Sequence, residues 1–378
     1  MSGSSRLFDP LPIGPANLQH RLVLAPLTRY RADDDHVPLP FVPEYYSQRG
    51  SLPGTLLIAE GTFIHPRAGG YRNVPGIYNA EQITAWKKIT DEVHAKGSFI
   101  YLQLWALGRA ADPVVAKAEG IELLGPSAMP MRPEAAVPKE MTKSDIQDFI
   151  SYYAQAGKNA IEAGFDGVEL HGANGYLIDQ FLRDVSNSRT DEYGGSIENR
   201  SRFGLEAVKA VIEAIGAERV GIRFNPYSRF QGMGMENPVP QFSHIIENLK
   251  RFNLSYIHLV RGRIADNADV EHVDSIDFAI RLWGPERPLL INGGYKPDSA
   301  KRLVDEEYEN YNIAVVFGRY WITTPDLAFR VKHGIELTPY ERAKFYIPKS
   351  PEGYIDYPFS AEFLKAQAVL SPQPPGLH

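Results

Sequence analysis

The chain has 378 residues, of which 43% are hydrophobic and 23% charged, and its formal net charge is −6 at pH 7. These values are typical of a globular protein with a large core, and the negative charge argues against nucleic acid as a partner, since that needs a basic face. There is no cysteine, which excludes disulfides and thiolate chemistry, and no run of about 18 apolar residues that would span a membrane. We therefore expect a cytoplasmic enzyme with no membrane or nucleic-acid partner.

Short apolar runs alternate along the chain with longer segments of helical period. Strands are predicted at residues 22–25, 56–59, 99–103, 167–170, 220–224, 256–260, 289–291 and 314–317. Helices are predicted between them at residues 81–96, 143–163, 202–215, 242–253 and 325–333. Strands that alternate with helices indicate parallel βαβ units, and eight such units predict an α/β fold that closes into a single (β/α)8 TIM barrel. We expect residues 1–378 to form one domain.

Such a barrel needs about 250 residues, so the remaining length must lie in loops and terminal segments. The largest insertion is expected at residues 108–140, after the third strand, and a second irregular stretch at residues 182–199. Residues 11–19 are predicted to form an N-terminal hairpin that plugs the base of the barrel. The clearest helix start is Thr142-Lys-Ser-Asp145, a capping-box pattern.

Polar side chains follow the predicted strands at the ends where a TIM barrel carries its active site. Those that suit chemistry are Thr28 after the first strand, Gln103 and Trp105 after the third, His171 and Asn174 after the fourth, Arg223 in the fifth and Arg319 after the eighth. The sequence therefore predicts one site at this end of the barrel.

The segment from His171 to Tyr176 offers a specific chemistry. Two neutral donors, His171 and Asn174, that converge on one oxygen would stabilise an enolate, and the Tyr176 phenol is suited to deliver a proton to carbon. The structural alternatives are a hydrogen-bonded core histidine and a packing tyrosine. A metal site is not expected, because neither cysteine nor a His-Glu-x-x-His pattern occurs.

Arg223 lies inside an apolar run, so its guanidinium needs an anionic or strongly accepting partner. A structural ion pair or a bound anionic cofactor would provide one. Gly318-Arg319 and Asn292-Gly293-Gly294 follow the last two strands, where TIM barrels commonly bind phosphate. Together they predict a phosphorylated ligand.

From Leu7 to Phe359 the chain resembles the Old Yellow Enzyme family of FMN-dependent ene-reductases. The motifs that carry the resemblance are Ala25-Pro-Leu-Thr-Arg-Tyr-Arg31, Glu60-Gly-Thr62, Gln103-Leu-Trp105, His171-Gly-Ala-Asn-Gly-Tyr176, Asn187-Ser-Arg-Thr-Asp-Glu-Tyr-Gly-Gly-Ser-Ile-Glu-Asn-Arg200, Gly318-Arg-Tyr320 and Gly353-Tyr-Ile-Asp-Tyr-Pro358. The Gly108-Arg-Ala-Ala-Asp-Pro113 segment is similar to the fungal branch, including the chanoclavine-aldehyde reductases of ergot pathways.

The resemblance implies a role for each matching residue. It assigns Thr28 to the flavin O4, Gln103 to the pyrimidine edge, and Arg223 to N1 and O2, where reduced flavin gathers negative charge. The other cofactor contacts that it implies are Pro26, Leu27, Ala59 and His171, with Gly293, Gly318 and Arg319 at the phosphate. It implies that His171 and Asn174 bind the substrate carbonyl, that Tyr176 protonates Cα, and that the pocket is shaped by Trp105, Tyr71, Phe345 and Tyr346.

The implied enzyme is an NADPH dehydrogenase or ene-reductase that binds FMN non-covalently and reduces the C=C bond of enals and enones. Hydride passes from flavin N5 to Cβ, and Tyr176 supplies the proton. A redox-neutral isomerase or cyclase of a secondary metabolite is the alternative, which the presence of Tyr176 disfavours, and a non-catalytic barrel that binds a partner is a further one. A monomer or homodimer is expected.

Overall fold

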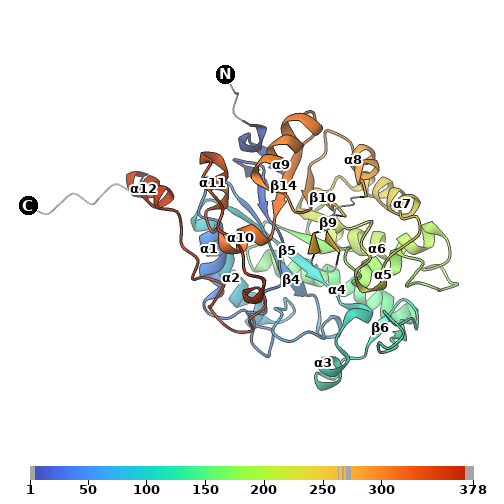
Figure 1. Ribbon diagram of the computed structural model, residues 1–378. Coiled ribbons are helices and arrows are strands. Elements are labelled where there is room, and N and C mark those ends of the chain that lie inside the picture. Colours follow the sequence, from blue (N-terminus) through green and yellow to red (C-terminus); the bar gives the residue numbers. More distant parts are fainter. Residues whose placement is uncertain (1–4, 263, 266–267, 270–273, 371–378) are drawn as a thin grey trace, which may run out of the picture.

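The computed structural model describes residues 5–262, 264–265, 268–269 and 274–370, and the loop after Val260, on which pocket size was expected to depend, falls partly outside them. Parallel strands form a closed barrel of eight (Figure 1), so the predicted fold is confirmed. In barrel order from the first, the strands are β3 (Leu22–Leu24), β4 (Leu56–Phe63), β5 (Phe99–Trp105), β8 (Gly167–His171), β9 (Val220–Phe224), β10 (Tyr256–Val260), β13 (Leu289–Asn292) and β14 (Ile313–Phe317). Every strand predicted from the sequence is present.

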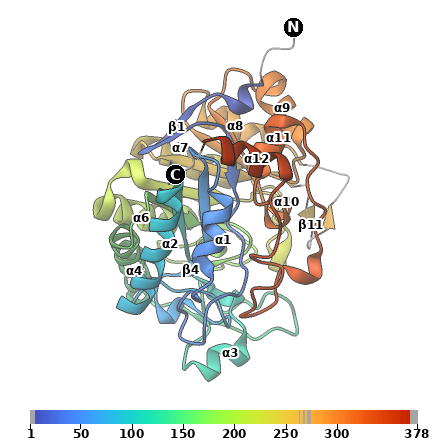
Figure 2. The same cartoon turned by 90° about the vertical axis from the view of Figure 1, so that its left-hand side faces the viewer.

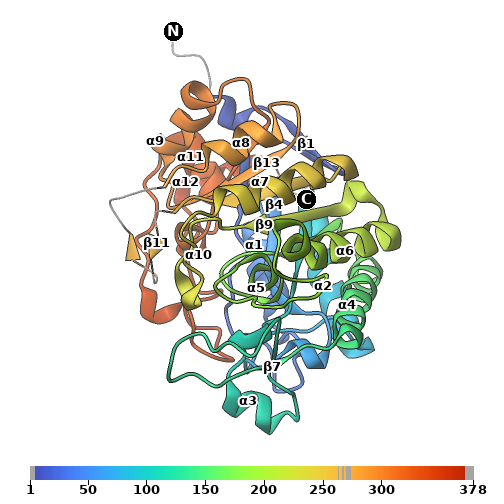
Figure 3. The ribbon, with the colours of Figure 1, turned by 90° about the vertical axis from the view of Figure 1, so that its right-hand side faces the viewer.

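A ring of helices covers the barrel wall. In chain order its members include α1 (Val42–Arg49), α2 (Ala80–Ala95), α4 (Lys143–Glu162), α6 (Ile197–Ile215), α7 (Val239–Leu249), α8 (Asp277–Trp283), α9 (Pro297–Arg302) and α11 (Leu327–His333). Neighbours in the chain pack side by side, from α1 and α2 (Figure 2) to α6, α7 and α8 (Figure 3). Alternate strand residues such as Val168 and Leu170 point outward into the core beneath these helices.

Several helix ends differ from the prediction. The capping box at Thr142 and Asp145 is present, but α6 begins at Ile197, capped by Ser196, so the stretch 182–199 is not irregular throughout. A cap is a local side-chain bond, and the apolar periodicity of α6 becomes clear only further along the helix. The helix expected to reach residue 253 ends at Leu249 and continues as a 3-10 turn, because Asn253 adopts φ 53° and cannot extend it.

In the part of the chain that the structure describes, seven helices of five to ten residues were not predicted, because such short elements show little periodicity. They are α3 (Pro113–Ala118) in the insertion, α5 (Leu177–Leu182), α10 (Arg319–Thr323) and α12 (Ala361–Leu370), besides α1, α8 and α9. The insertion after β5 also contains two short strands, β6 (Leu124–Gly125) and β7 (Lys139–Glu140). Within the described ranges, no helix combines the length and apolar character that crossing a bilayer requires.

The base of the barrel is closed by the hairpin β1 (Leu11–Ile13) and β2 (Ala16–Leu18). Its buried residues pack on inward-facing strand side chains, including Tyr101 and Tyr256. The predicted plug is therefore confirmed.

The chain segment after α11 returns to the barrel mouth as a strap, defined here as residues 342–360. Arg29 donates to the carbonyls of Phe345 (2.9 Å) and Gly353 (2.7 Å). Arg31 donates to Ser350 and Glu352 at 2.9 and 2.8 Å. These buried guanidinium groups fix the strap over residues that lie more than 300 positions earlier in the chain.

Candidate active site

The mouth of the barrel contains a cavity of about 500 Å³ at the carboxyl ends of its strands. Eleven of the predicted site residues line it, namely Pro26, Leu27, Thr28, Tyr71, Trp105, Asn174, Tyr176, Arg223, Gly318, Arg319 and Tyr346, and Phe345 joins them. The other four, Ala59, Gln103, His171 and Gly293, are not among the lining residues, and the first three are buried in the barrel wall. The structure thus brings the predicted residues to one end of the barrel, while their ligand contacts stay predictions.

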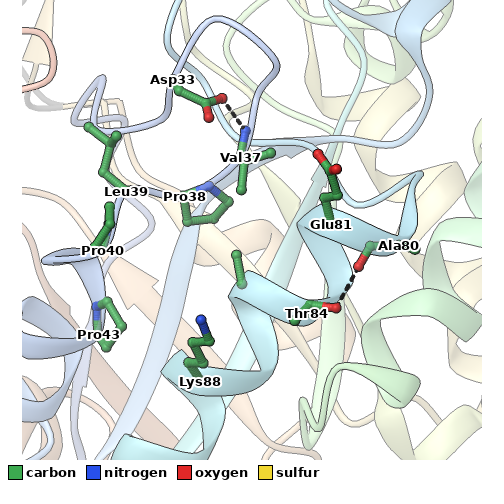
Figure 4. A pocket seen from close by; sticks show the side chains of 11 residues that line it. Asp33, Val37, Pro38, Leu39, Pro40, Pro43, Ala80, Glu81, Thr84 and Lys88 are labelled. Carbon is green, nitrogen blue, oxygen red and sulfur yellow. Dashed lines mark hydrogen bonds between the residues drawn. The ribbon is translucent and has the colours of Figure 1, made fainter.

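A second hollow of similar volume, about 520 Å³, lies between residues 33–43 and the start of α2 (Figure 4). Three prolines line it, Asp33 accepts the Val37 amide proton at 2.8 Å, and the Thr84 hydroxyl donates to the Ala80 carbonyl at 2.7 Å. Its polar groups are thus partly used within the chain, and its lining contains no histidine, arginine or aromatic side chain. We therefore place the active site at the barrel mouth.

The barrel-mouth cavity is positively charged although the whole chain is negative. Among the described residues that line it, Arg29, Arg223, Lys296, Arg319 and Arg342 are basic and none is acidic. Lys296 lies four residues after the end of β13 and Arg319 two residues after the end of β14, and Gly294 and Gly318 line the cavity with them. Such a lining attracts an anion, and it includes Gly318 and Arg319, where the sequence predicted a phosphate.

His171 ends β8 and is almost fully buried. Burial lowers its pKa well below the usual value, and Arg223 and His258 lower it further, so the imidazole is neutral at pH 7. Its ring lies 6.0 Å from that of Trp105 and 4.9 Å from that of Tyr176. Its Nδ1 atom is buried and has no hydrogen-bond partner among the described residues.

Asn174 and Gly175 form a tight turn with φ of 58° and 80°. Asn225, which sequence reasoning missed, donates from Nδ2 to the Asn174 Oδ1 atom at 2.8 Å, leaving the Asn174 amide NH2 group as a donor. The turn is anchored from below, where Asp179 accepts the Gly175 amide proton at 2.9 Å and is itself bonded by Arg183 at 2.7 Å. Asp179 and Arg183 are four residues apart in one helical turn, a spacing that was visible in the sequence.

Tyr176 stands edge-on to Trp105, with ring centroids 4.7 Å apart. Its enclosure raises its pKa well above the usual value, and the nearby phenols of Tyr71 and Tyr30 add to this effect. The phenol is therefore protonated throughout the neutral range. A protonated phenol beside neutral donors is suited to act as a general acid.

Arg223 extends from β9, and one of its terminal nitrogens donates to Asn292 Oδ1 at 3.4 Å. Glu169 is one anionic partner of this buried guanidinium, because it raises the pKa of Arg223 while burial lowers it. The Glu169 carboxylate in turn accepts a hydrogen bond from Gln103 Nε2 at 2.7 Å. Sequence reasoning gave Glu169 no role, although its alternation with His171 in the strand indicates that both point inward.

These features fit the FMN that the resemblance implies. Buried donors without a partner in the described structure, Trp105 Nε1, His171 Nδ1 and Arg223 Nε, belong to residues at the cavity or directly beneath it, and a buried polar group normally has a partner. A flat polar ring system that carries a phosphate would use both the donors and the positive charge. No group of three or more histidine and acidic side chains in the described residues is placed to hold a metal ion.

Together with the motifs of the sequence, a parallel barrel with this mouth points to a flavin-dependent oxidoreductase built on a TIM barrel. The chain belongs to the NADH:flavin oxidoreductase / NADH oxidase family, whose model matches residues 6–338. It is 54% identical over 363 residues to the chanoclavine-I aldehyde reductase fgaOx3 of Penicillium roqueforti, covering 96% of this chain and 98% of the relative. It is 53% identical over 378 residues to the probable inactive reductase easA of Epichloe festucae var. lolii, covering 97% and 100%.

Among solved structures, the Old Yellow Enzyme of a Pichia species superposes with a TM-score of 0.88 at 39% identity and covers 94% of both chains. The resemblance to the fungal branch of the Old Yellow Enzymes is therefore confirmed. The protein is an oxidoreductase of the Old Yellow Enzyme type.

Proposed function

We propose that the protein is an ene-reductase that binds FMN non-covalently, takes its electrons from NADPH and reduces the C=C bond of conjugated aldehydes and ketones. The single observation that carries this proposal is the protonated Tyr176 phenol, set edge-on beside the neutral His171 at the mouth of a positively charged cavity. Further support comes from the Penicillium relative, which is named an aldehyde reductase.

Bound FMN would supply the hydride. The residues suited to hold it are Thr28, Gln103 and Arg223 at the ring, Pro26, Leu27 and Ala59 beside it, and Gly293, Gly318 and Arg319 at the phosphate. The Arg223 guanidinium would stabilise negative charge on the pyrimidine portion.

The protein's own residues account for the rest of the reaction. His171 and the Asn174 amide NH2 group would donate to the substrate carbonyl oxygen and stabilise it as it gains enolate charge. Tyr176 would release its proton to Cα. Trp105, Tyr71, Phe345 and Tyr346 line the same cavity and would hold the alkene over the flavin and exclude water.

A role without net reduction is the second candidate, because the Epichloe relative is described as a probable inactive reductase. Such a role would be a redox-neutral isomerisation or cyclisation, or binding alone. In this chain the presence of Tyr176 favours net reduction, because a net reductase needs a group that supplies a proton to carbon.

The test uses purified holoenzyme. We expect a yellow protein whose flavin absorbance bleaches on anaerobic addition of NADPH and returns when an enal or enone is added. In turnover with a panel of both classes, one molecule of saturated product should form for each NADPH oxidised. A colourless protein that does not take up FMN, or isomerised product formed without net NADPH oxidation, would contradict the proposal. A parallel series with NADH tests the choice of nucleotide.

A further inference from the structure

Glu169 is a buried acid in the middle of the barrel. It lies in β8, its side chain is fully buried, and it points inward, because its neighbours Val168 and Leu170 belong to the outer core. A carboxylate in such a place is costly unless it is paired and hydrogen-bonded. We therefore looked for the groups that stabilise this buried charge and for its role.

Three side chains from two other strands converge on it. Gln103 Nε2 donates to one carboxylate oxygen at 2.7 Å, and Tyr256 OH donates to the other at 3.1 Å. The second oxygen also meets His258 Nδ1 at 2.9 Å. This cluster, called here the Glu169 hub, joins β5, β8 and β10.

The barrel leaves room for the hub by omitting one side chain. Gly221 of β9 is in register with both Glu169 and Tyr256, and a Cβ atom there would lie only 2.5 Å from the Tyr256 ring. Glycine at this position allows Tyr256 to reach past β9 to the carboxylate of β8. The hub is thus built into the strand sequences.

The hub carries one negative charge. Burial alone would raise the pKa of Glu169, but His258, Arg223 and Gln103 together hold it below its usual value. Burial, helped by Arg223, lowers the pKa of His258, so this imidazole is neutral and donates its Nδ1 proton to the carboxylate. With His258 neutral, Arg223 is the cation among these groups, and it lies two residues beyond Gly221 in β9, in register with His171.

The hub also fixes the orientation of Gln103. Because one Nε2 proton is bonded to Glu169, the amide cannot turn over without placing its oxygen against the carboxylate. The Gln103 carbonyl oxygen is left to accept a hydrogen bond. The pyrimidine edge of a flavin carries an N–H donor between two carbonyl oxygens, so an oriented amide matches it and a flipped one does not.

We propose that Glu169 is a positioning residue of the flavin site, which holds the Gln103 amide in the orientation that binds the flavin's pyrimidine edge and offsets the positive charge of Arg223 so that reduced flavin is not over-stabilised. This inference rests on the proposed binding of FMN. Glu169, which lies beneath the site, would then help to set the reduction potential of the flavin.

The first test is Glu169→Gln, which keeps the size of the side chain and removes its charge. His258 can adapt by moving its proton to Nε2, so that Nδ1 accepts from the new amide. The ratio of affinities for reduced and oxidised FMN should rise about tenfold, which for a two-electron couple is roughly 30 mV more positive. A dye-linked titration measures the potential. An unchanged potential in folded, flavin-loaded protein would overturn the proposal.

Two further variants separate charge from packing. Tyr256→Phe removes a hydrogen bond from the hub but no charge, so the potential should stay that of the wild type; a shift as large as that of Glu169→Gln would assign the effect to packing and overturn the proposal. Glu169→Asp keeps the charge, but its shorter side chain moves the carboxylate away from Gln103. Its apoprotein should bind FMN about tenfold more weakly in a fluorescence titration, and wild-type affinity would overturn the orienting role.

The Glu169→Asp measurement decides the proposal if Glu169→Gln does not fold. Failure of the proposed function looks different, because then wild-type protein itself would neither contain nor take up FMN. If the wild type binds FMN and the Glu169 variants match it in potential and affinity, only the role of Glu169 is refuted.

Discussion

Replacement of Arg183 by methionine should destabilise the protein and loosen the turn at Asn174 and Gly175. Arg183 and Asp179 form an ion pair in which both side chains are fully buried. Besides Asp179, the guanidinium donates to the carbonyls of Asn225, Pro226, Ser228 and Met233, at 2.6, 3.1, 3.3 and 2.7 Å respectively. The substitution leaves a buried carboxylate without its cation and removes the guanidinium donor from four carbonyls, of which the Asn225 carbonyl still accepts the Ser228 amide proton at 3.2 Å.

Removing one partner of a buried pair costs about 3–5 kcal/mol, and the additional loss of the donor to these carbonyls places Arg183→Met at the upper end of this range. With roughly 2.1 cal/mol/K of unfolding entropy per residue, a chain of 378 residues should lose about 4–6 °C of Tm. Asp179→Asn should cost less, because Arg183 keeps its four carbonyl acceptors. Chemical denaturation followed by circular dichroism, supported by thermal melts, measures these losses.

A matched control is available on the surface. Arg281 bonds Asp277 with the same four-residue spacing and the same 2.7 Å distance, but its side chain is 69% exposed, so Arg281→Met should cost less than about 1 kcal/mol. Arg183→Met should also weaken binding of substrate-like phenols, because Asp179 holds the Gly175 amide. If both arginine variants lose the same stability, burial is not what gives the Arg183 pair its importance.

Three other predictions concern acid stability, proton delivery and pocket shape. Burial, and then Lys332, lower the pKa of His20 to about 4. Between pH 6.5 and 4 this histidine is therefore protonated in the unfolded chain but not in the folded chain, so the free energy of unfolding falls as the pH falls. Between these two pH values, the free energy of unfolding of His20→Gln, measured by urea titration, should fall by up to about 3 kcal/mol less than that of the wild type. If both proteins show the same dependence on pH, the pKa of His20 is not lowered. Tyr176→Phe should leave flavin reduction by NADPH intact and slow reoxidation by enones about 10²–10⁴-fold in stopped-flow; an unchanged reoxidation rate would remove Tyr176 as the acid. At Gly61 a Cβ atom would lie 2.6 Å from the Trp105 ring, so Gly61→Val should push that ring into the cavity and lower kcat/KM by about tenfold to a hundredfold with FMN content unchanged; wild-type kinetics would show that the ring can yield elsewhere.

The barrel could be predicted because its pattern is local. Each strand is a short apolar run, and polar residues such as His171 and Arg223 interrupt the runs where the strands reach the mouth. The positions of these residues within the barrel follow from strand register alone. The cavity walls at Tyr71 and Tyr346 came instead from family resemblance, since no periodicity connects residues so far apart in the chain.

The Glu169 hub shows why some residues around the site could not be predicted from the sequence. Glu169 stands in an otherwise apolar strand, and its partners Tyr256 and His258 lie 87 and 89 residues away. Only closure of the barrel, together with the space left by Gly221, brings them into contact. The prediction of an irregular stretch at residues 182–199 was wrong in part for a different reason, because the side chain of one residue, Ser196, determines where α6 begins.

The strap has a consequence for how the protein is made. The bond between Arg29 and Phe345 joins residues 316 positions apart, and at roughly 5–20 residues per second the ribosome releases the two partners about 15–60 s apart. During that interval Arg29 and Arg31 have been synthesised but their carbonyl acceptors have not. The early strands β3, β4 and β5 are therefore synthesised well before the strap, whose Phe345 and Tyr346 form one wall of the barrel-mouth cavity, so this wall forms late in synthesis.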